Sequence, residues 1–362
     1  MADRVLLHLG TPKSGTTWLQ QLLWNNRSAL ARAGVGFPGW RPEAHFLACQ
    51  DLLGVEFNDW PDPGVAGAWR RLVDQVRAVR GTAVVSHELF GDAPADVAAR
   101  ALADLAPAEV HLVVTARDLA RQLPAVWQED VKNRHTTSYP DFLDAAGPRP
   151  GAPGWSGAAF WHRQDVPAVL RRWAGSAVPP ERVHVVVVPP RGASLDVLWH
   201  RFAGVLGAPA ELVDLPAASA VNRSLGVAES ELLRRLNGRL EGRVPWPLHA
   251  ERITHHLAPV VLAPRAGRPL TLPPADHRWV SARSRAMTAE LAAAGYDVAG
   301  DLTELVVPPL PPAAAVDDRA PDDAELLDAA LDALAGLVAT RPDPAPPLPR
   351  RIARRLARLV DR

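Results

Sequence analysis

The chain has 362 residues, of which 40 are basic and 40 acidic, so its formal net charge is zero. This length suits one large α/β domain with appendages, and a hydrophobic content of 48% is enough for a packed core. Balanced charge argues against a broadly basic nucleic-acid-binding protein, so any anion site has to be local. A single cysteine, Cys49, excludes a disulfide framework or a cysteine-rich metal site.

The start of the sequence and its hydropathy bear on location. No charged-then-apolar leader precedes Arg4, and no apolar run reaches the ~18 residues needed to cross a bilayer. We therefore expect a cytoplasmic protein without an integral membrane segment.

Four short apolar runs predict buried strands. They span residues 4–10, 82–86, 110–115 and 183–188. Segments with helical spacing of apolar residues precede, separate and follow them, at 14–32, 65–80, 93–105, 119–133, 160–174 and 195–206. The alternation predicts an α/β fold of the P-loop type, with three layers and a central parallel sheet flanked by helices.

Strand signals fade after Leu215, and helical periods return at 229–240, 248–262 and 275–294. We expect a core at 1–215, a helical extension packed on it at 216–305, and a proline-rich linker with C-terminal helices at 306–362. In the last part, 322–339 predicts an acidic, leucine-rich helix. Residues 349–362 are basic, and four apolar side chains fall on one helical stripe: Ile352, Leu356, Leu359 and Val360. This segment either docks on the protein's own core or contacts a partner or an anionic membrane surface.

The loop after the first strand is a candidate phosphate site. It reads Gly10-Thr11-Pro12-Lys13-Ser14-Gly15-Thr16-Thr17-Trp18. Backbone N–H groups around Gly15, where a helix begins, form an anion site with the positive end of the helix dipole. Lys13 adds a mobile positive charge, Thr16 and Thr17 add hydroxyl donors, and Trp18 offers a flat face for a purine.

The nearest alternative is the nucleoside-triphosphate loop GxxxxGK[ST]. Gly10 and Gly15 have its spacing, but Thr16 stands where that loop has lysine, and the lysine lies before the second glycine, at Lys13. No acidic residue ends the second or third strand as a clean magnesium ligand. A Walker-type kinase or ATPase is therefore the less favoured alternative.

The run Pro12 to Trp18, PKSGTTW, resembles the 5′-phosphosulfate loop of the sulfotransferases that use 3′-phosphoadenosine-5′-phosphosulfate (PAPS). The resemblance implies transfer of a sulfuryl group to a hydroxyl or amine, without a metal, leaving adenosine 3′,5′-bisphosphate. It also implies that Lys13 contacts the anhydride and helps the leaving group. Ser14 to Thr17 would hold the 5′-phosphate, and Trp18 would lie near the adenine.

A second anion motif is Val113-Val-Thr-Ala-Arg-Asp118, which follows a buried strand and opens a helix. Arg117 therefore lies at the carboxyl edge of the sheet, where ligands bind in open α/β folds, and can grip a phosphate with two parallel bonds. In the family such an arginine binds the 3′-phosphate, helped by a serine eight residues on, but here that position is Ala125. Arg223 or Ser224 could compensate. Alternatively, Arg117 pairs with Asp118.

Transfer to a hydroxyl needs a base to take the acceptor's proton. Two adjacent candidates, His87 and Glu88, follow the strand at 82–86, and the resemblance gives this role to the histidine in cytosolic relatives or to a glutamate in others. The rivals are Glu43 and, ranked below it, His45, in a run that weakly resembles the base element of heparan-type sulfotransferases.

Aromatic residues follow the nucleotide-binding half and predict either an acceptor pocket or core packing. They include Trp127, Trp155, Phe160 and Trp161, with Gln128 beside the first. The expected partner is a small-molecule acceptor, a metabolite, lipid or sugar. A non-catalytic nucleotide-binding or scaffold relative remains the other alternative, and the sequence does not decide the oligomeric state.

Overall fold

The computed structural model describes residues 2–148, 157–175, 177–215, 224–265, 267–307, 310 and 320–339. Within these ranges, six parallel strands form one sheet in the order β2-β3-β1-β4-β5-β6. The strands are β1 (Ala2–His8), β2 (Val35–Gly36), β3 (Gly81–Ser86), β4 (Glu109–Ala116), β5 (Val183–Val187) and β6 (Asp297–Ala299). The expected α/β fold with a central parallel sheet is confirmed.

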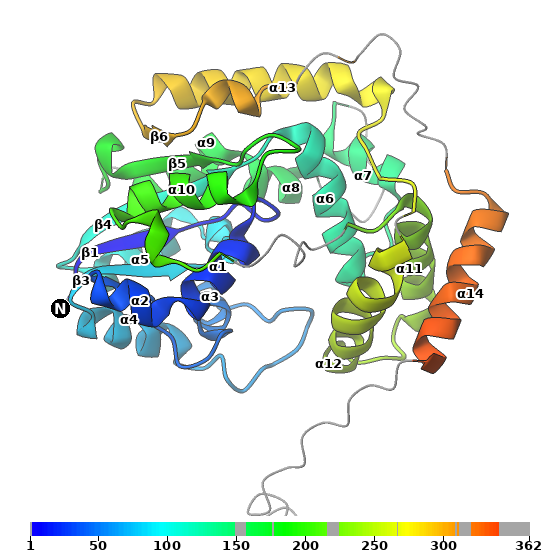
Figure 1. The fold of residues 1–362 in the computed structure, drawn as a ribbon, viewed down its shortest axis with the longest axis horizontal. Helices are drawn as coiled ribbons and strands as arrows, with labels where there is room; N and C mark the ends of the chain where they lie inside the picture. The colour runs from blue at the N-terminus through cyan, green and yellow to red at the C-terminus, as the bar shows by residue number, and fades with distance from the viewer. Residues whose placement is uncertain are drawn as a thin grey trace, which may run out of the picture.

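The helices between the strands cover both faces of this sheet (Figure 1). Those of the first half are α1 (Thr16–Asn25), α2 (Arg27–Arg32), α3 (Ala44–Leu53), α4 (Ala68–Ala78), α5 (Ala95–Leu105), α6 (Leu119–Lys132), α7 (Tyr139–Ala146), α8 (Gly157–Gln164), α9 (Val166–Ala174) and α10 (Leu195–Leu206). The short 3₁₀ helix η1 (Glu88–Asp92) follows β3.

Two buried clusters explain the three layers. Successive side chains of a strand point to opposite faces, so Leu7 of β1 joins a cluster with α3 to α6 and α9, whereas Leu6 joins one with α1, α2 and α10. Both leucines are fully buried. The near-continuous apolar strands are typical of a sheet covered on both faces.

The C-terminal part contributes α11 (Val227–Leu240), α12 (Trp246–His249), the π-helix η5 (Ala250–Leu262), α13 (Pro274–Ala293) and α14 (Asp323–Ala339). Figure 1 shows α11, α12 and α14 grouped to one side of the sheet, with α13 running along it. One expectation needs correction: 216–305 is not only a helical extension, because β6 pairs with β5 and completes the core sheet. A strand of three residues is too short to leave an apolar run in the sequence.

Candidate active site

The candidate site lies where the strand order reverses. β1 has β3 on one side and β4 on the other, so the segments that follow these three strands meet at one edge of the sheet. Open α/β sheets bind ligands in this position. The loop Thr11 to Gly15, the pair His87 and Glu88, and Arg117 all emerge there.

Two glycines shape the loop. Gly15 precedes α1 with a φ of 88°, in the left-handed region that favours glycine. Gly10 runs so close to the η1 start that a Cβ on it would lie 2.9 Å from Glu88 Cα. The Leu19 N–H makes the first backbone hydrogen bond of α1, to Gly15 O at 3.1 Å. The preceding N–H groups therefore lie at the helix mouth and suit an anion.

Ser14 corrects one expectation, because its hydroxyl faces inward. Ser14 is fully buried and its Oγ donates to Thr11 O and contacts Thr115 Oγ1. Gln122 and Gln164 each donate a side-chain N–H to Pro12 O. These bonds hold the loop in shape, and the Ser14 hydroxyl already has its partners within the protein.

The other loop residues differ in their exposure. Thr16 is buried at the start of α1, where it helps to lower the pKa of Glu88. Thr17 is exposed on the first turn of α1. Trp18 is half-buried and packs against the cluster beneath α1. Part of its indole ring stays exposed, where an adenine ring could contact it.

Lys13 forms an ion pair that the sequence did not reveal. Its Nζ lies 2.9 Å from Glu129 Oε2 on α6, and Lys132 Nζ lies 2.6 Å from the same oxygen. Burial raises the pKa of the Glu129 carboxyl, but the two lysines lower it further and hold it at about 2. The carboxylate is therefore ionised at neutral pH and competes with any anion for Lys13.

Arg117 lies on the other side of the loop. Its Nη1 donates to Lys13 O at 3.1 Å, so it braces the loop from below. Burial, Arg121 and Arg191 lower the pKa of its guanidinium to about 10, and the group stays charged at neutral pH. The alternative pairing with Asp118 does not form, because Asp118 caps α6 and pairs with Arg121.

A small cavity of about 20 Å³ lies behind Arg117, towards α13. Three polar atoms around it are buried without a hydrogen-bond partner in the described part of the chain: Arg117 Nε, Gln122 Oε1 and Thr288 Oγ1. The space suits one water molecule with several polar partners.

The structure shows no side chain that assists Arg117 at positions 125 and 224. Ala125 offers no side-chain hydrogen bond at its place on α6. Ser224 is exposed, and no hydrogen bond or ion pair joins its side chain to the loop in the part of the chain that the structure describes. Arg223 lies outside the described residues.

Glu88 has the best position among the four candidate bases. It lies next to Gly10, and Gln20 Nε2 donates to its Oε2 at 3.4 Å. Burial raises its pKa, but His87 and the hydrogen bonds from its own backbone N–H, Thr16 and Gln20 outweigh this and leave the pKa below its usual range. Glu88 is therefore an ionised carboxylate beside the loop.

His87 is half-buried, and its ring is tilted by 38° against that of Phe46, with 5.3 Å between ring centroids. Its Nδ1 accepts the Leu89 N–H at 3.2 Å, which places the ring proton on Nε2 and leaves no free lone pair for a base. Burial lowers the pKa of His87, so the ring is neutral at pH 7.

The two rivals lie elsewhere. His45 is buried. Its Nδ1 accepts the Ser86 N–H at 3.1 Å, and its Nε2 donates to Pro38 O at 2.6 Å. Both ring nitrogens are therefore hydrogen-bonded to backbone groups. Glu43 is exposed and pairs with Arg41 at 3.4 Å. These contacts disfavour His45 as a base, whereas the assignment of Glu43 stays a prediction.

Sequence reasoning missed a buried polar ladder under the loop. His8, at the end of β1, has its Nδ1 2.8 Å from Ser86 Oγ and its Nε2 3.2 Å from Thr115 Oγ1. The ladder joins the ends of β3, β1 and β4 and continues to Ser14. A histidine within an apolar strand that is otherwise buried is the signal that could have revealed it.

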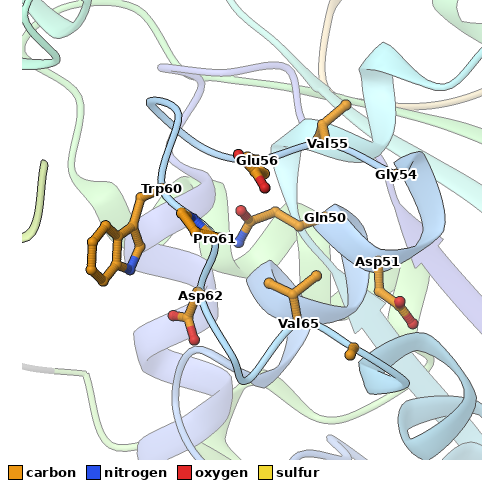
Figure 2. A pocket seen from close by; sticks show the side chains of 10 residues that line it. Gln50, Asp51, Gly54, Val55, Glu56, Trp60, Pro61, Asp62 and Val65 are labelled. Carbon is orange, nitrogen blue, oxygen red and sulfur yellow. The ribbon is translucent and has the colours of Figure 1, made fainter.

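The aromatic residues divide between packing and surface. Trp127 and Phe160 are buried, Trp127 donates to Thr137 O, and Gln128 donates to Leu225 O. Trp161 is half-buried and donates to Ala146 O, whereas Trp155 lies outside the described residues. A hollow of about 320 Å³ instead lies between the end of α3 and the loop that follows it, with Trp60 at its rim and Asp51, Glu56 and Asp62 in its wall (Figure 2).

Comparisons with known proteins add one likeness. The chain is similar to a sulfotransferase of known structure. That protein, from Alicyclobacillus acidocaldarius, shares 16% sequence identity with it, at a TM-score of 0.46 over 82% of this chain and 96% of that one. No family model matches the chain, and no curated protein does. At that distance the function has to be inferred from the residues of the site.

The described residues contain neither a membrane-spanning helix nor a cluster of metal ligands. None of their helices combines the length and apolar character needed to cross a membrane. No group of three or more histidine, cysteine, aspartate or glutamate side chains among them could hold a metal ion.

Proposed function

We propose that this chain is a sulfotransferase that uses PAPS as donor and a hydroxyl or amine of a small metabolite, lipid or sugar as acceptor. The observation that carries the proposal is the placement of two cations around one helix mouth. Lys13 lies in the loop before α1, and Arg117 lies at the end of the adjacent strand β4. A nucleotide with anionic groups at both its 5′ and 3′ positions offers a partner to each of these two cations.

The residues present fit this donor. The N–H groups at the start of α1 and the Lys13 ammonium suit the 5′-phosphosulfate, and the Arg117 guanidinium suits the 3′-phosphate. The exposed part of Trp18 suits the adenine.

In the proposed reaction, the acceptor oxygen forms a bond to sulfur while the bond from sulfur to the bridging phosphate oxygen breaks. Glu88 takes the acceptor's proton, and Lys13 stabilises the charge that develops on the leaving phosphate. A nearby polyanion raises the pKa of a carboxylate, so donor binding would make Glu88 a stronger base than it is in the free protein.

One observation favours a second candidate, a nucleoside-triphosphate enzyme. Thr16 on the loop lies close enough to Glu88 after β3 to help lower the pKa of its carboxylate, and Mg²⁺ in such enzymes is held by a loop hydroxyl and a strand-end carboxylate. Glu88 therefore stands closer to a magnesium position than the sequence indicated. The position of Lys13 before Gly15 still disfavours this candidate.

A non-catalytic nucleotide-binding relative is the third candidate. Ala125, in place of the family serine, and the inward-facing Ser14 hydroxyl favour it. It predicts nucleotide binding without transfer.

Calorimetry with adenosine 3′,5′-bisphosphate tests the proposal. We expect binding to the wild type and at least a tenfold loss in Lys13→Ala and in Arg117→Ala, on the order of 1.4 kcal/mol for a charge-assisted contact. Arg171→Ala is the control, because Arg171 pairs with Glu290 on α13, outside the loop, and affinity should not change. Loss of affinity on Arg117→Ala should be smaller for adenosine 5′-phosphate.

Three results would reject the proposal. Magnesium-dependent ATP binding without affinity for the bisphosphate would indicate the nucleoside-triphosphate enzyme. Equal affinity of the wild type for adenosine 5′-phosphate and the bisphosphate would remove the role of Arg117. A chain that binds the bisphosphate but transfers no labelled sulfuryl group to a panel of phenol, sugar and amine acceptors would indicate the non-catalytic relative.

A further inference from the structure

Helix α14 carries an apolar stripe that faces outward. Leu327, Leu331, Leu334 and Val338 follow one another at steps of four, three and four residues, so they share one face of the helix. Their exposed fractions are 60%, 56%, 61% and 84%. An exposed apolar row of this kind marks an interaction surface.

The opposite face of α14 is firmly attached to the protein. Leu326, Ala329 and Ala333 are buried there, against η5 and α11. Arg265 links the helix to the core, because it pairs with Asp328 on α14 and with the buried Glu229 on α11. The stripe is therefore an outer face of a fixed helix, at the edge of the molecule in Figure 1.

The acidic character of α14 indicates which kind of partner suits the stripe. Residues 322–339 contain five acidic residues and no basic residue, whereas residues 349–362 contain six arginines and one aspartate. Asp328 and Asp332 of α14 remain largely exposed although Arg265 pairs with them. A basic amphipathic segment therefore complements this helix, while a second copy of α14 or an anionic membrane would be repelled by it.

The chain that follows α14 is long enough for residues 349–362 to reach the stripe. The stripe from Leu327 to Val338 is about 16 Å long at 1.5 Å per residue, and a helix over 349–362 would be about 21 Å long. The nine residues 340–348, four of them proline, can span up to about 28 Å in an extended form. The apolar positions 352, 356, 359 and 360 can thus reach the stripe from either end.

We propose that residues 349–362, which lie outside the described residues, dock on the stripe of α14 as an antiparallel or parallel helical partner. Their Ile352, Leu356 and Leu359 would cover the exposed leucines, and their arginines would lie beside Asp328 and Asp332. This surface is separate from the P-loop, so the inference stands whether or not the proposed enzyme activity does.

Cysteine cross-linking in the full-length chain tests the docking. The native Cys49 is fully buried, so introduced cysteines react selectively. A double variant Leu331→Cys with Leu356→Cys should form an intramolecular disulfide under mild oxidation. The matched control is Leu331→Cys with Arg358→Cys, because Arg358 falls on the opposite side of the expected helix. We expect at least fivefold more cross-linked monomer in the first pair.

Hydrogen exchange gives a second readout that needs no cross-link. Amides of 349–362 should exchange at least tenfold more slowly than an unstructured chain, and the surface variant Leu331→Asp with Leu334→Asp should abolish this protection. Three outcomes would overturn the proposal. They are disulfide-linked dimers in the first pair, exchange at the unstructured rate in the wild type, and protection that appears only with vesicles of anionic phospholipid.

Discussion

Replacing Glu129 with glutamine should strengthen binding of adenosine 3′,5′-bisphosphate. In the free protein Lys13 is 2.9 Å from this carboxylate, and a pKa of about 2 keeps the carboxylate charged. A donor that takes Lys13 has to break this pair and then lies near the remaining negative charge. Glu129→Gln removes both penalties and keeps the shape of the side chain.

The size of the effect follows from the exposure of the pair. The two side chains are 33% and 34% exposed, and pairs with this degree of solvent contact contribute about 0.5–1 kcal/mol. Lys132 still pairs with Glu129 when Lys13 leaves, so the free-energy cost of breaking the Lys13–Glu129 pair lies near the lower end of this range. Repulsion between the carboxylate and the incoming phosphates adds about 1 kcal/mol through solvent. The sum is about 1.4 kcal/mol, or tenfold in affinity.

Calorimetry at pH 7.5 and low salt measures this directly. The control is Glu290→Gln on α13, where the carboxylate pairs with Arg171, outside the loop, and affinity should not change. Higher salt should reduce the gain from Glu129→Gln, because partly exposed charges are screened. Unchanged or weaker binding in Glu129→Gln would refute the reasoning, since it would mean that Glu129 holds Lys13 in its binding position.

Three more outcomes are expected. Glu88→Gln should lower the rate constant of transfer by about 10²–10⁴, whereas Glu43→Gln should not alter it; equal losses would disprove the choice of base. His8 and His45 have pKa values lowered by burial from 6.5 to about 4, so the unfolded chain binds more protons in this window. The free energy of unfolding should therefore fall as the pH drops from 6.5 towards 4, and His8→Gln should reduce that fall in urea titrations. Ser14→Ala should lower stability by about 1 kcal/mol but leave bisphosphate affinity within twofold, because its hydroxyl faces inward; a large loss of affinity would show that the hydroxyl turns to the ligand.

The regular elements of the first half could be read from the sequence because their signals are local. The observed strands β1, β3, β4 and β5 and the helices α6 and α10 lie within two residues of the predicted ends. Apolar runs and helical periods arise from the strand or helix itself, so no knowledge of the neighbours is needed. The edge strands β2 and β6 escaped because two or three residues carry no such period.

The loop around Lys13 and the arginine after β4 were also evident in the sequence, since both are contiguous motifs at strand ends. The partners of these residues were not, because they come from distant parts of the chain. Glu129 reaches Lys13 across 116 residues, Gln164 reaches Pro12 across 152, and His8 joins Ser86 across 78. Only packing of α6, α8 and β3 around the loop brings these pairs together. The choice of Glu88 over His87 likewise depended on which lone pair the backbone had already taken. The sequence alone therefore determined the type of fold and the place of the candidate anion site, whereas tertiary packing decided which side chains of that site already have partners within the protein.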